Sequence, residues 1–589
     1  MRMRAEDRTT EEGVRFRDLN GNGVMDPYED PRLGTEERVE DLLARLSIEE
    51  KAGLLFHTVI EIGEGGELRE EPGAISKSPT SQVVRDKHLT HFNVHGMRTA
   101  REGARWNNRL QELAAGTPHG IPVTISTDPR HAFVENSGVA FAAGPFSQWP
   151  EPLGLAALDD VELVRRFARI AGREYRAVGI RMALHPQVDL PTEARWGRQA
   201  QTLGYDADRV TEMTGAYLEG FQGAELGPES VACITKHFPG GGPQLDGEDA
   251  HFPYGREQVY PGGRFEEHLR PFVEAIRRDT AGIMPYYGMP VGLVRHGEPI
   301  EEVGFSYSRQ IVTELLREEL GYDGVVLSDW ELINDNHVGD QVLPARAWGV
   351  EDLTPRERML RLLDAGVDQF GGEECVELLL GLVAEGAVAE ERIVGAAEFR
   401  AEGERAQAAS VTVLQNSDGT LPLFRGERPR VYAEGVAAEA LAEYADPASS
   451  PEDADVALVR IGAPFEPRND LFLEAWFHQG SLDFPPGLVA RLRRIATHCS
   501  LVIVVNLDRP AILTPFVPFA AAIAVEFGSS DAALLAALSG RIPPRGVLPV
   551  DIPRSMDAVR AAFADVPDGT EDPVFRRGTG LTIDGPGAQ

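Results

Sequence analysis

Short apolar segments alternate with polar loops and helix-forming segments over the first two thirds of the chain, and this alternation constrains the fold more than any other feature. Buried strands of parallel sheets are short apolar runs of this kind. The order strand, polar loop, helix is typical of a barrel or a doubly wound sheet. The expected strands lie at 121–126, 181–185, 231–235, 281–284 and 325–327, with a last one within 365–372.

A second alternating series occupies the last third of the chain. Five nearly all-apolar segments lie at 410–414, 430–433, 456–461, 501–507 and 522–527. Helical patterns fall between them, so we expect a buried, mostly parallel sheet with helices on both faces. The stretch 375–408 has a nearly continuous helical pattern and would connect the two series. At 589 residues the chain is too long for one core, and two or more domains are expected.

The composition excludes several classes of partner and location. The net charge of −35 disfavours binding to nucleic acid or to an anionic membrane. The sequence has no run of about 18 apolar residues that would predict a membrane span. Residues 1–7 lack the apolar run of a signal peptide, and the three scattered cysteines suit a reducing compartment. The sequence therefore predicts a cytoplasmic protein.

Residues 18–29 have the spacing of a calcium-binding loop. Gly23 is the sixth residue counted from Asp18, the position where glycine permits a sharp turn. Hard oxygens at these offsets can wrap one cation. A structural Ca²⁺ is therefore predicted, and an Asn/Gly-rich turn without an ion is the alternative. The predicted ligands are the Val24 carbonyl and the side chains of Asp18, Asn20, Asn22, Asp26 and Glu29.

Polar and aromatic residues follow several of the expected strands. In barrels of alternating strands and helices, the chemistry lies at the C-terminal strand ends. Charged groups beside aromatic faces suit an uncharged, polyhydroxylated ring. Singly, each residue has a structural explanation, since Asp329 could cap a helix and Lys236 and His237 could form a salt-bridge pair. Together they favour a site formed by Asp128, Arg195, Lys236, His237, Tyr287, Asp329 and Trp330.

Three motifs in this order resemble the signatures of glycoside hydrolase family 3, the β-glucosidase family. They are Arg-Trp-Gly-Arg at 195–198, Lys-His-Phe-Pro-Gly at 236–240 and Ser-Asp-Trp at 328–330. The resemblance runs over nearly the whole chain and implies a (β/α)8 TIM-like barrel followed by an α/β sandwich. The domains would be an N-terminal segment with the calcium loop (1–33), the barrel (34–385), a helical linker (386–408) and the sandwich with its tail (409–589).

The resemblance also implies an exo-acting, retaining β-glycosidase that needs no cofactor for catalysis. Asp329 would attack the anomeric carbon and form a covalent glycosyl-enzyme. Tyr287 would lie beside this nucleophile and Trp330 would line the subsite. The hydroxyls of the terminal sugar would be held by Asp128, Arg195, Lys236 and His237. The expected substrate is a β-linked glucoside or oligosaccharide with a terminal non-reducing β-D-glucosyl residue, and a homo-oligomer is left open.

The acid/base residue is predicted less directly. In many relatives it is a Glu in a loop of the second domain, and the matching region here predicts Glu466, with Asp470 and Glu474 as alternatives. A different branch, the N-acetylglucosaminidases, uses an Asp–His pair after the Lys-His-Phe motif, and Asp249 and His251 occupy such positions here.

This leaves three functions open. A β-glucosidase is expected. An N-acetylhexosaminidase or phosphorylase would use the pair of Asp249 and His251. A sugar-binding protein without activity would keep the fold and lack the acid/base residue.

Overall fold

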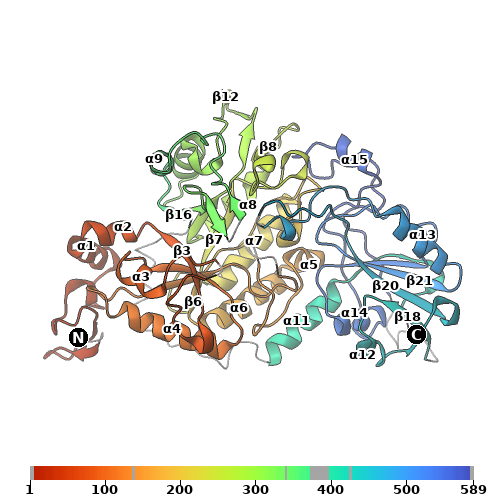
Figure 1. The fold of residues 1–589 in the computed structure, drawn as a ribbon, viewed down its shortest axis with the longest axis horizontal. Coiled ribbons are helices and arrows are strands. Elements are labelled where there is room, and N and C mark those ends of the chain that lie inside the picture. The colour runs from red at the N-terminus through yellow and green to blue at the C-terminus, as the bar shows by residue number, and fades with distance from the viewer. Residues whose placement is uncertain are drawn as a thin grey trace.

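The computed structural model describes residues 6–73, 75–135, 140–338, 341–371, 397–423, 428–471 and 473–583. Two sheets organise the described chain, one in the N-terminal part, coloured red to green in Figure 1, and one in the C-terminal part, coloured blue. Among the described helices, none is both long enough and apolar enough to cross a membrane.

Eight parallel strands form the first sheet. A parallel bridge between Phe56 and Phe370 joins its two ends, so the sheet closes into a barrel. The expected (β/α)8 architecture is thereby confirmed. In order around the barrel, the strands are β3 (His57–Glu61), β4 (His91–His95), β5 (Thr124–Thr127), β6 (Ile180–Ala183), β7 (Ala232–Phe238), β9 (Gly282–Pro285), β13 (Val325–Trp330) and β16 (Gln369–Gly371).

A helix lies in each crossover between successive barrel strands. Short polar side chains begin several of them, because Thr99, Asp160 and Asp206 accept a backbone N–H from the first turn of α4, α6 and α7. The crossover helices are α3 (Thr80–Arg85), α4 (Ala100–Ala114), α5 (Pro152–Ala157), α6 (Val161–Ala177), α7 (Ala207–Gln222), α8 (Phe265–Arg277), the π-helix Gln310–Glu319 and α9 (Pro355–Ala365).

Strands β3 and β4 are the two barrel strands that sequence reasoning missed. They carry His57, His91, Asn93 and His95, so they lack the continuous apolar run that identifies a buried strand. These polar side chains are tolerated because they hydrogen-bond inside the barrel, as His57 does with Ser126. Between these two strands, α3 forms near the end of the polar, Gly- and Pro-containing stretch 61–90.

The second sheet has six strands, in the order β17 (Thr412–Asn416), β22 (Ala522–Glu526), β21 (Ser500–Asn506), β20 (Val456–Gly462), β18 (Arg430–Glu434) and β19 (Asp446–Pro447). Every neighbouring pair is parallel except β17 with β22. The mostly parallel sheet expected from the sequence is confirmed.

Helices cover both faces of this sheet. Leu458, Val502 and Val504 pack in one cluster with α14 (Asp531–Leu538), whereas the alternate residues Val459 and Ile503 pack with α13 (Pro486–Ile495). Figure 1 shows α13 on one side of the sheet, and α14 and α12 (Ala438–Leu441) on the other. This alternation follows from the period of two in a strand.

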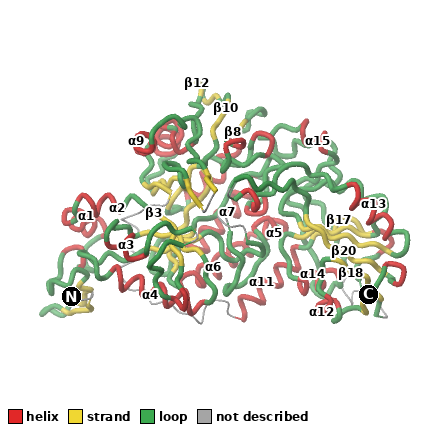
Figure 2. Tube along the Cα trace, viewed as in Figure 1, coloured by secondary structure: helices red, strands yellow, loops and turns green. Residues whose placement is uncertain are grey.

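The connection between the two sheets is described only in part. Residues 397–410 form α11 (Ala397–Ser410), which confirms the C-terminal end of the helical stretch expected over 375–408. The predicted domain boundary at 385 lies outside the described residues. Loops occupy much of the space between the barrel and the second sheet in Figure 2.

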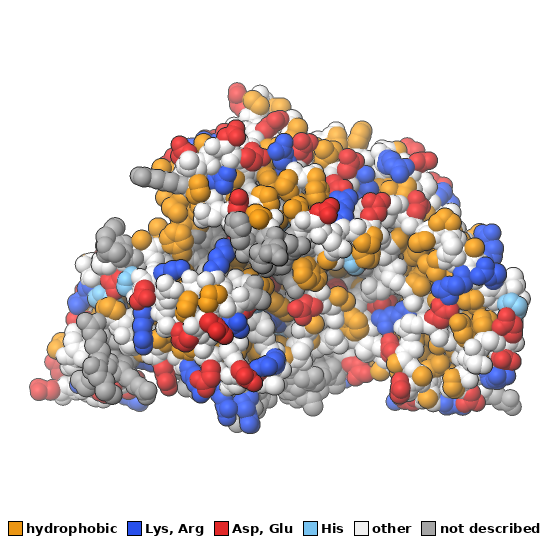
Figure 3. All heavy atoms as spheres, in the orientation of Figure 1, with side chains coloured by type: hydrophobic (Ala, Val, Ile, Leu, Met, Phe, Trp, Pro, Cys, Tyr) orange, Lys and Arg blue, Asp and Glu red, His pale blue; other side chains and the backbone are white. Residues whose placement is uncertain are grey.

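Shorter elements complete the fold. The N-terminal ones precede the barrel, and the others decorate its loops or the C-terminal tail. They are β1 (Glu6–Thr9), β2 (Arg15–Asp18), α1 (Thr35–Arg45), α2 (Ile48–Gly53), β8 (Glu257–Val259), β10 (Met289–Val291), β11 (Val294–Arg295), β12 (Glu298–Pro299), β14 (Asn336–Val338), β15 (Gln341–Leu343) and α15 (Met556–Ala561). On the face drawn in Figure 3, acidic and basic side chains are interspersed over both parts of the molecule.

Candidate active site

A cavity of about 140 Å³ lies at the C-terminal ends of the barrel strands. Parallel strands bring their C-terminal ends together at one mouth, so residues far apart in the sequence meet there. Six of the predicted site residues line this cavity, namely Asp128, Lys236, His237, Tyr287, Asp329 and Trp330.

The Asp329 carboxylate is only partly hydrogen-bonded by the protein itself. It lies in β13 and its side chain is 8% exposed. Its Oδ1 atom accepts a hydrogen bond from the backbone N–H of Trp330 at 2.8 Å. Its Oδ2 atom is buried and has no hydrogen-bond partner among the described residues. A buried oxygen left without a donor is costly, so the site favours a ligand that engages this oxygen.

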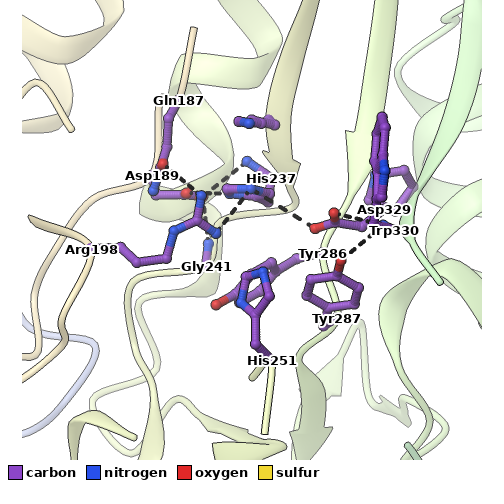
Figure 4. Close-up of polar contacts among 12 residues, drawn as sticks. Gln187, Asp189, Arg198, His237, Gly241, His251, Tyr286, Tyr287, Asp329 and Trp330 are labelled. Carbon is purple, nitrogen blue, oxygen red and sulfur yellow. Dashed lines mark hydrogen bonds and ion pairs between the residues drawn. The ribbon is translucent and has the colours of Figure 1, made fainter. Parts of the chain in front are cut away.

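His237 lies between Asp189 and Arg198, as Figure 4 shows. Its Nδ1 is 2.8 Å from Asp189 Oδ2, and its Nε2 is 3.1 Å from the Arg198 guanidinium. Burial, with the nearby Arg198 charge, holds the pKa of His237 well below its ordinary value, so the ring is neutral. With Nδ1–H donating to Asp189, Nε2 accepts from Arg198.

Asp128 and Lys236 form a buried ion pair on another wall of the cavity. The Lys236 Nζ atom is 2.8 Å from Asp128 Oδ1, and Asn93 donates to Asp128 Oδ2 at 3.2 Å. Both charged side chains are only 6% exposed. A carboxylate beside an ammonium group offers both acceptors and donors, which is the combination that vicinal hydroxyls require.

Tyr287 and Trp330 flank Asp329. The Tyr287 hydroxyl accepts a hydrogen bond from the Trp330 backbone N–H at 2.8 Å. Burial and the Asp329 charge raise the pKa of Tyr287 well above its ordinary value, so the hydroxyl keeps its proton. The Trp330 ring contacts His57 edge-on, with ring centroids 5.4 Å apart. These contacts fix the aromatic wall next to the carboxylate.

A charged cluster of Lys77, Glu331 and Arg346 also lines the cavity. Arg346 is 2.8 Å from Glu331, and Lys77 is 3.2 Å from the same carboxylate. Burial opposes the charge on Glu331, but Arg346 and Lys77 outweigh it and lower the pKa of Glu331. The charged form of Glu331 is therefore favoured, and this carboxyl is poorly suited to donate a proton.

Arg195 lies outside the lining of this cavity. Its guanidinium pairs with Glu193 at 2.8 Å and with Asp246 at 3.1 Å. The arginine of the same motif that lines the cavity is Arg198. The structure therefore does not bring Arg195 together with the other predicted hydroxyl-binding residues. Arg198, which was not among the predicted site residues, lines the cavity instead.

Glu466, Asp470 and Glu474 also lie outside the cavity lining. Glu466 is exposed, and its carboxylate accepts a hydrogen bond from the Ser481 backbone N–H at 3.2 Å. Glu474 is buried, but it accepts hydrogen bonds from the Tyr254 hydroxyl and from the backbone of Asp470. The loop that carries these three residues contributes Leu473 to the cavity.

His251 lines the cavity and forms a pair with Asp249. Its Nδ1 lies 2.6 Å from Asp249 Oδ1, while Trp196 donates to Asp249 Oδ2 at 2.8 Å. Burial lowers the pKa of His251, although Asp249 opposes this shift. Burial disfavours the Asp249 charge, but His251 and Arg198 outweigh it, so the pKa of Asp249 is lowered. Figure 4 shows the His251 ring near Tyr286 and Tyr287.

Polar residues of β3 and β4 complete the cavity. His57, Asn93 and His95 line it, and burial lowers the pKa of His95 to about 4. The signal for them in the sequence is weak. A strand that carries several histidines reads as a loop, although inward-pointing polar residues of a barrel are a mark of its functional end.

The predicted calcium loop is arranged around hydrogen bonds and two arginines. Arg8 is 2.9 Å from Asp18 Oδ2, and Arg45 is 3.0 Å from Asp26. The Glu29 carboxylate accepts three backbone N–H groups of the loop. Among the described residues, no three His, Cys, Asp or Glu side chains are arranged to hold a metal ion. The Oδ1 atom of Asp18, which is buried without a described hydrogen-bond partner, is the atom that suits a cation, and calcium binding stays a prediction.

Comparison with known proteins agrees with the motifs. Residues 53–399 match the family model described as the glycosyl hydrolase family 3 N-terminal domain. A probable β-glucosidase C from Aspergillus flavus is 46% identical over 592 aligned positions, covering 95% of this chain and 92% of that protein. A periplasmic β-glucosidase/β-xylosidase from Dickeya chrysanthemi is 39% identical, covering 97% of this chain and 94% of that protein.

Solved structures share the fold. A β-glucosidase from Erythrobacter marinus superposes with a TM-score of 0.76 at 18% identity, covering 94% of this chain and 84% of that chain. A β-glucosidase from Listeria innocua in complex with glucose superposes with a TM-score of 0.69 at 17% identity, covering 93% of this chain and 83% of that chain. The family match and the close relatives together establish that this chain is a glycosidase belonging to glycoside hydrolase family 3.

Proposed function

We propose that the protein is a retaining, exo-acting β-glucosidase that removes terminal non-reducing β-D-glucosyl residues. The observation that carries this proposal is the buried Oδ2 atom of Asp329, which lines the strand-end cavity and has no hydrogen-bond partner among the described residues. Relatives named β-glucosidase and a structural neighbour solved with glucose support the choice of a glucosyl substrate.

In the first step, Asp329 Oδ2 attacks the anomeric carbon as the bond from that carbon to the leaving oxygen breaks. The leaving oxygen takes a proton from the general acid, and the sugar is held as an ester of Asp329. In the second step, the same group takes a proton from water as the water oxygen attacks the anomeric carbon. Asp329 is released as a carboxylate, and the anomeric configuration is retained.

We assign the proton transfer to His251, although the sequence favoured Glu466. His251 lines the cavity with Asp329, whereas Glu466 is exposed and lies outside the lining. The Nδ1–H of His251 faces Asp249, so Nε2 is the ring nitrogen that can exchange a proton with the leaving oxygen. A carboxylate behind an imidazole orients the ring and stabilises the imidazolium form that acts as the acid.

The hydroxyls of the sugar would be held by groups on two walls of the cavity. Asp128 and Lys236 offer an acceptor and a donor side by side, and Arg198 lies next to His237. Trp330 would contact the apolar face of the ring. The ion pair of Arg346 and Glu331 would lie near the nucleophile and hold the position of the Tyr287 ring, over which Arg346 lies at 5.4 Å.

A phosphorylase is the second candidate, because the residue assigned as acid/base is a histidine and not a carboxylate. A carboxylate at this position would repel an incoming phosphate, whereas a neutral imidazole within reach of the Arg198 charge would not. In that case phosphate would replace water in the second step, and a sugar 1-phosphate would be the product.

Aryl β-glycosides test both candidates. We would measure turnover of the glucoside, xyloside and N-acetylglucosaminide by the wild type and by Asp329→Asn, with and without phosphate. A β-glucosidase should release glucose at the same rate without phosphate, and Asp329→Asn should lose nearly all turnover because the nucleophile is gone. The exposed Asp470→Asn serves as a control and should keep wild-type activity. If Asp329→Asn kept the wild-type turnover of any of these glycosides, Asp329 would not be the nucleophile. A rate that requires phosphate would favour the phosphorylase.

A further inference from the structure

The loop that follows β20 in the C-terminal domain packs on the barrel turn that carries Asp249 and His251. One side chain of this loop, Gln479, is fully buried. Its Oε1 atom accepts a hydrogen bond from the Asp249 backbone N–H at 2.9 Å, and its Nε2 atom donates to the Tyr254 hydroxyl at 3.3 Å. A single glutamine of the second domain therefore holds both ends of the turn 249–254.

A second side chain of the same loop, Phe477, packs against the His251 ring. The ring centroids of Phe477 and His251 are 4.8 Å apart, and those of Tyr287 and His251 are 4.7 Å apart. Phe477 is 2% exposed and also contacts Phe252 at 5.4 Å. The two rings that lie nearest to the imidazole thus come from the barrel and from the C-terminal domain, and both restrict its rotation.

The loop itself is anchored to both domains through Arg509. This side chain is 1% exposed and donates to the backbone carbonyls of Gln479 and Ser481 within the loop. It also donates to the backbone carbonyl of Arg195 in the barrel at 3.1 Å. Because these carbonyls are held, Gln479 and Phe477 meet the barrel turn at a fixed place.

We propose that Gln479 and Phe477 are positioning residues that hold the Asp249–His251 pair in its proton-transferring geometry. The C-terminal domain would then complete the active site through these two residues, without supplying the acid itself. The inference rests on the proposed function, in which His251 exchanges the proton. Its physical basis is that a catalytic group displaced by about 1 Å can lose on the order of 100-fold in rate.

The two positioning residues restrict different motions. Gln479 holds the backbone of the turn, and Phe477 limits rotation of the His251 ring. Without Gln479, the buried Asp249 N–H would lose its acceptor, and the turn would shift to find another. Without the Phe477 ring, His251 could rotate away from the leaving oxygen although its hydrogen bond to Asp249 remains. Both changes misplace the proton donor and leave Asp329 in place.

Leaving-group dependence separates a misplaced acid from a general loss of structure. A dinitrophenyl leaving group departs without a proton, whereas a phenyl group needs one. For Gln479→Ala and Phe477→Leu, we expect kcat/KM to fall by about 10- to 100-fold with the phenyl β-glycoside and by less than about threefold with the dinitrophenyl β-glycoside. His251→Ala provides the reference pattern, and Gln415→Ala is the matched control.

Gln415 is a glutamine of the same domain that donates to the backbone carbonyls of Val517 and Ala520, away from the cavity. Its replacement should lower the melting temperature without changing the ratio of the two substrates. Equal losses with both leaving groups, or no loss with either, in a Gln479→Ala protein that still unfolds cooperatively would overturn the positioning role.

The design also separates this inference from the proposed function. If His251→Ala discriminates between the leaving groups and Gln479→Ala and Phe477→Leu do not, the positioning inference alone fails. If His251→Ala affects both substrates equally, the assignment of His251 as the acid fails, and the positioning role falls with it.

Discussion

The Oδ2 atom of Asp329 lies 3.9 Å from the Nε2 atom of His237, beyond hydrogen-bond distance. The imidazole faces Asp189 with its other nitrogen and accepts from Arg198 at Nε2, so it has no proton to offer Asp329. A histidine placed this close to a carboxylate without bonding to it leaves that carboxylate available. The residues that hold His237 in this state are therefore as important to the site as His237 itself.

Replacing Arg198 should lower the activity much more than replacing Arg195. We expect Arg198→Ala to lower kcat/KM by about 100-fold or more, because His237 would lose its donor and the cavity would lose a cation. Arg195→Ala should have an effect at least tenfold smaller, since Arg195 pairs with Glu193 and Asp246 outside the cavity lining. Steady-state kinetics on one aryl glycoside checks both. A larger loss in Arg195→Ala would restore Arg195 as a sugar-binding residue.

The pH dependence should follow His251. Burial lowers the pKa of His251 below its ordinary value of about 6.5, although Asp249 opposes the shift. The protonated acid is lost as the pH rises through this lowered pKa. In the pH profile of kcat/KM with a phenyl glycoside, the midpoint of the basic limb should therefore lie below about pH 6.5.

With a dinitrophenyl glycoside, kcat/KM should decrease much less over the same rise in pH, since that leaving group needs no proton. The measurement is a pair of pH profiles of kcat/KM. A basic limb of the same position and depth for both substrates would argue that another group titrates.

Stability should also depend on pH, through Glu151. Burial raises the pKa of Glu151 to about 7, while the backbone N–H groups of Phe133 and Val134 oppose the shift. A carboxyl whose pKa is raised in the folded state binds protons more tightly there. Its contribution to the free energy of unfolding is complete below about pH 4.5 and is lost as the pH rises through about 7, a difference of about 3 kcal/mol.

Glu151→Gln should remove this dependence, because the amide cannot ionise. Urea unfolding at pH 5 and at pH 8 would measure it: the wild type should lose more stability between the two values than the variant does. The exposed Glu162→Gln is the control and should behave as the wild type. Parallel losses in wild type and Glu151→Gln would mean that Glu151 is already ionised at pH 5.

Calcium should raise the melting temperature if the loop 18–29 binds it. The Oδ1 atom of Asp18 is buried without a described hydrogen-bond partner and would gain a cation. At a calcium concentration about 100 times Kd, binding would add about 2.7 kcal/mol to the free energy of unfolding. Differential scanning calorimetry with calcium and with a chelator is the measurement. Identical melting curves would show that Arg8 and Arg45 hold the loop without an ion.

Much of the architecture could be predicted because buried strands have a simple pattern. The apolar runs around Val326 and Ile503 were identified as strands because both of their faces are covered by other elements. The same rule failed for β3 and β4. Their buried positions include His57 and Asn93, which hydrogen-bond to Ser126 and Asp128, and no local pattern reveals these partners.

The residues of the candidate site could likewise be predicted only in part. Asp329 and Lys236 follow or end apolar strands, and the geometry of a barrel brings such positions to one cavity. Arg195 and Arg198 lie three residues apart in one loop, and their sequence context does not say which of them turns inward. Glu466 was predicted from the family resemblance, because it lies in the matching loop of the second domain, but the structure leaves its carboxylate exposed.

The sequence by itself determined the family, the alternation of strands and helices, and the identity of the carboxylate at the end of β13, because these depend on local patterns and short motifs. Only the tertiary structure decided which arginine meets His237, and that His251 and not Glu466 shares the cavity with Asp329. The physical reason is that these residues are held by contacts between distant segments of the chain. The hydrogen bond between Gln479 and Asp249, for example, joins the two domains across 230 residues of sequence. Such contacts depend on how loops from distant parts of the chain pack together, and the packing of one loop on another leaves no periodic trace in either segment.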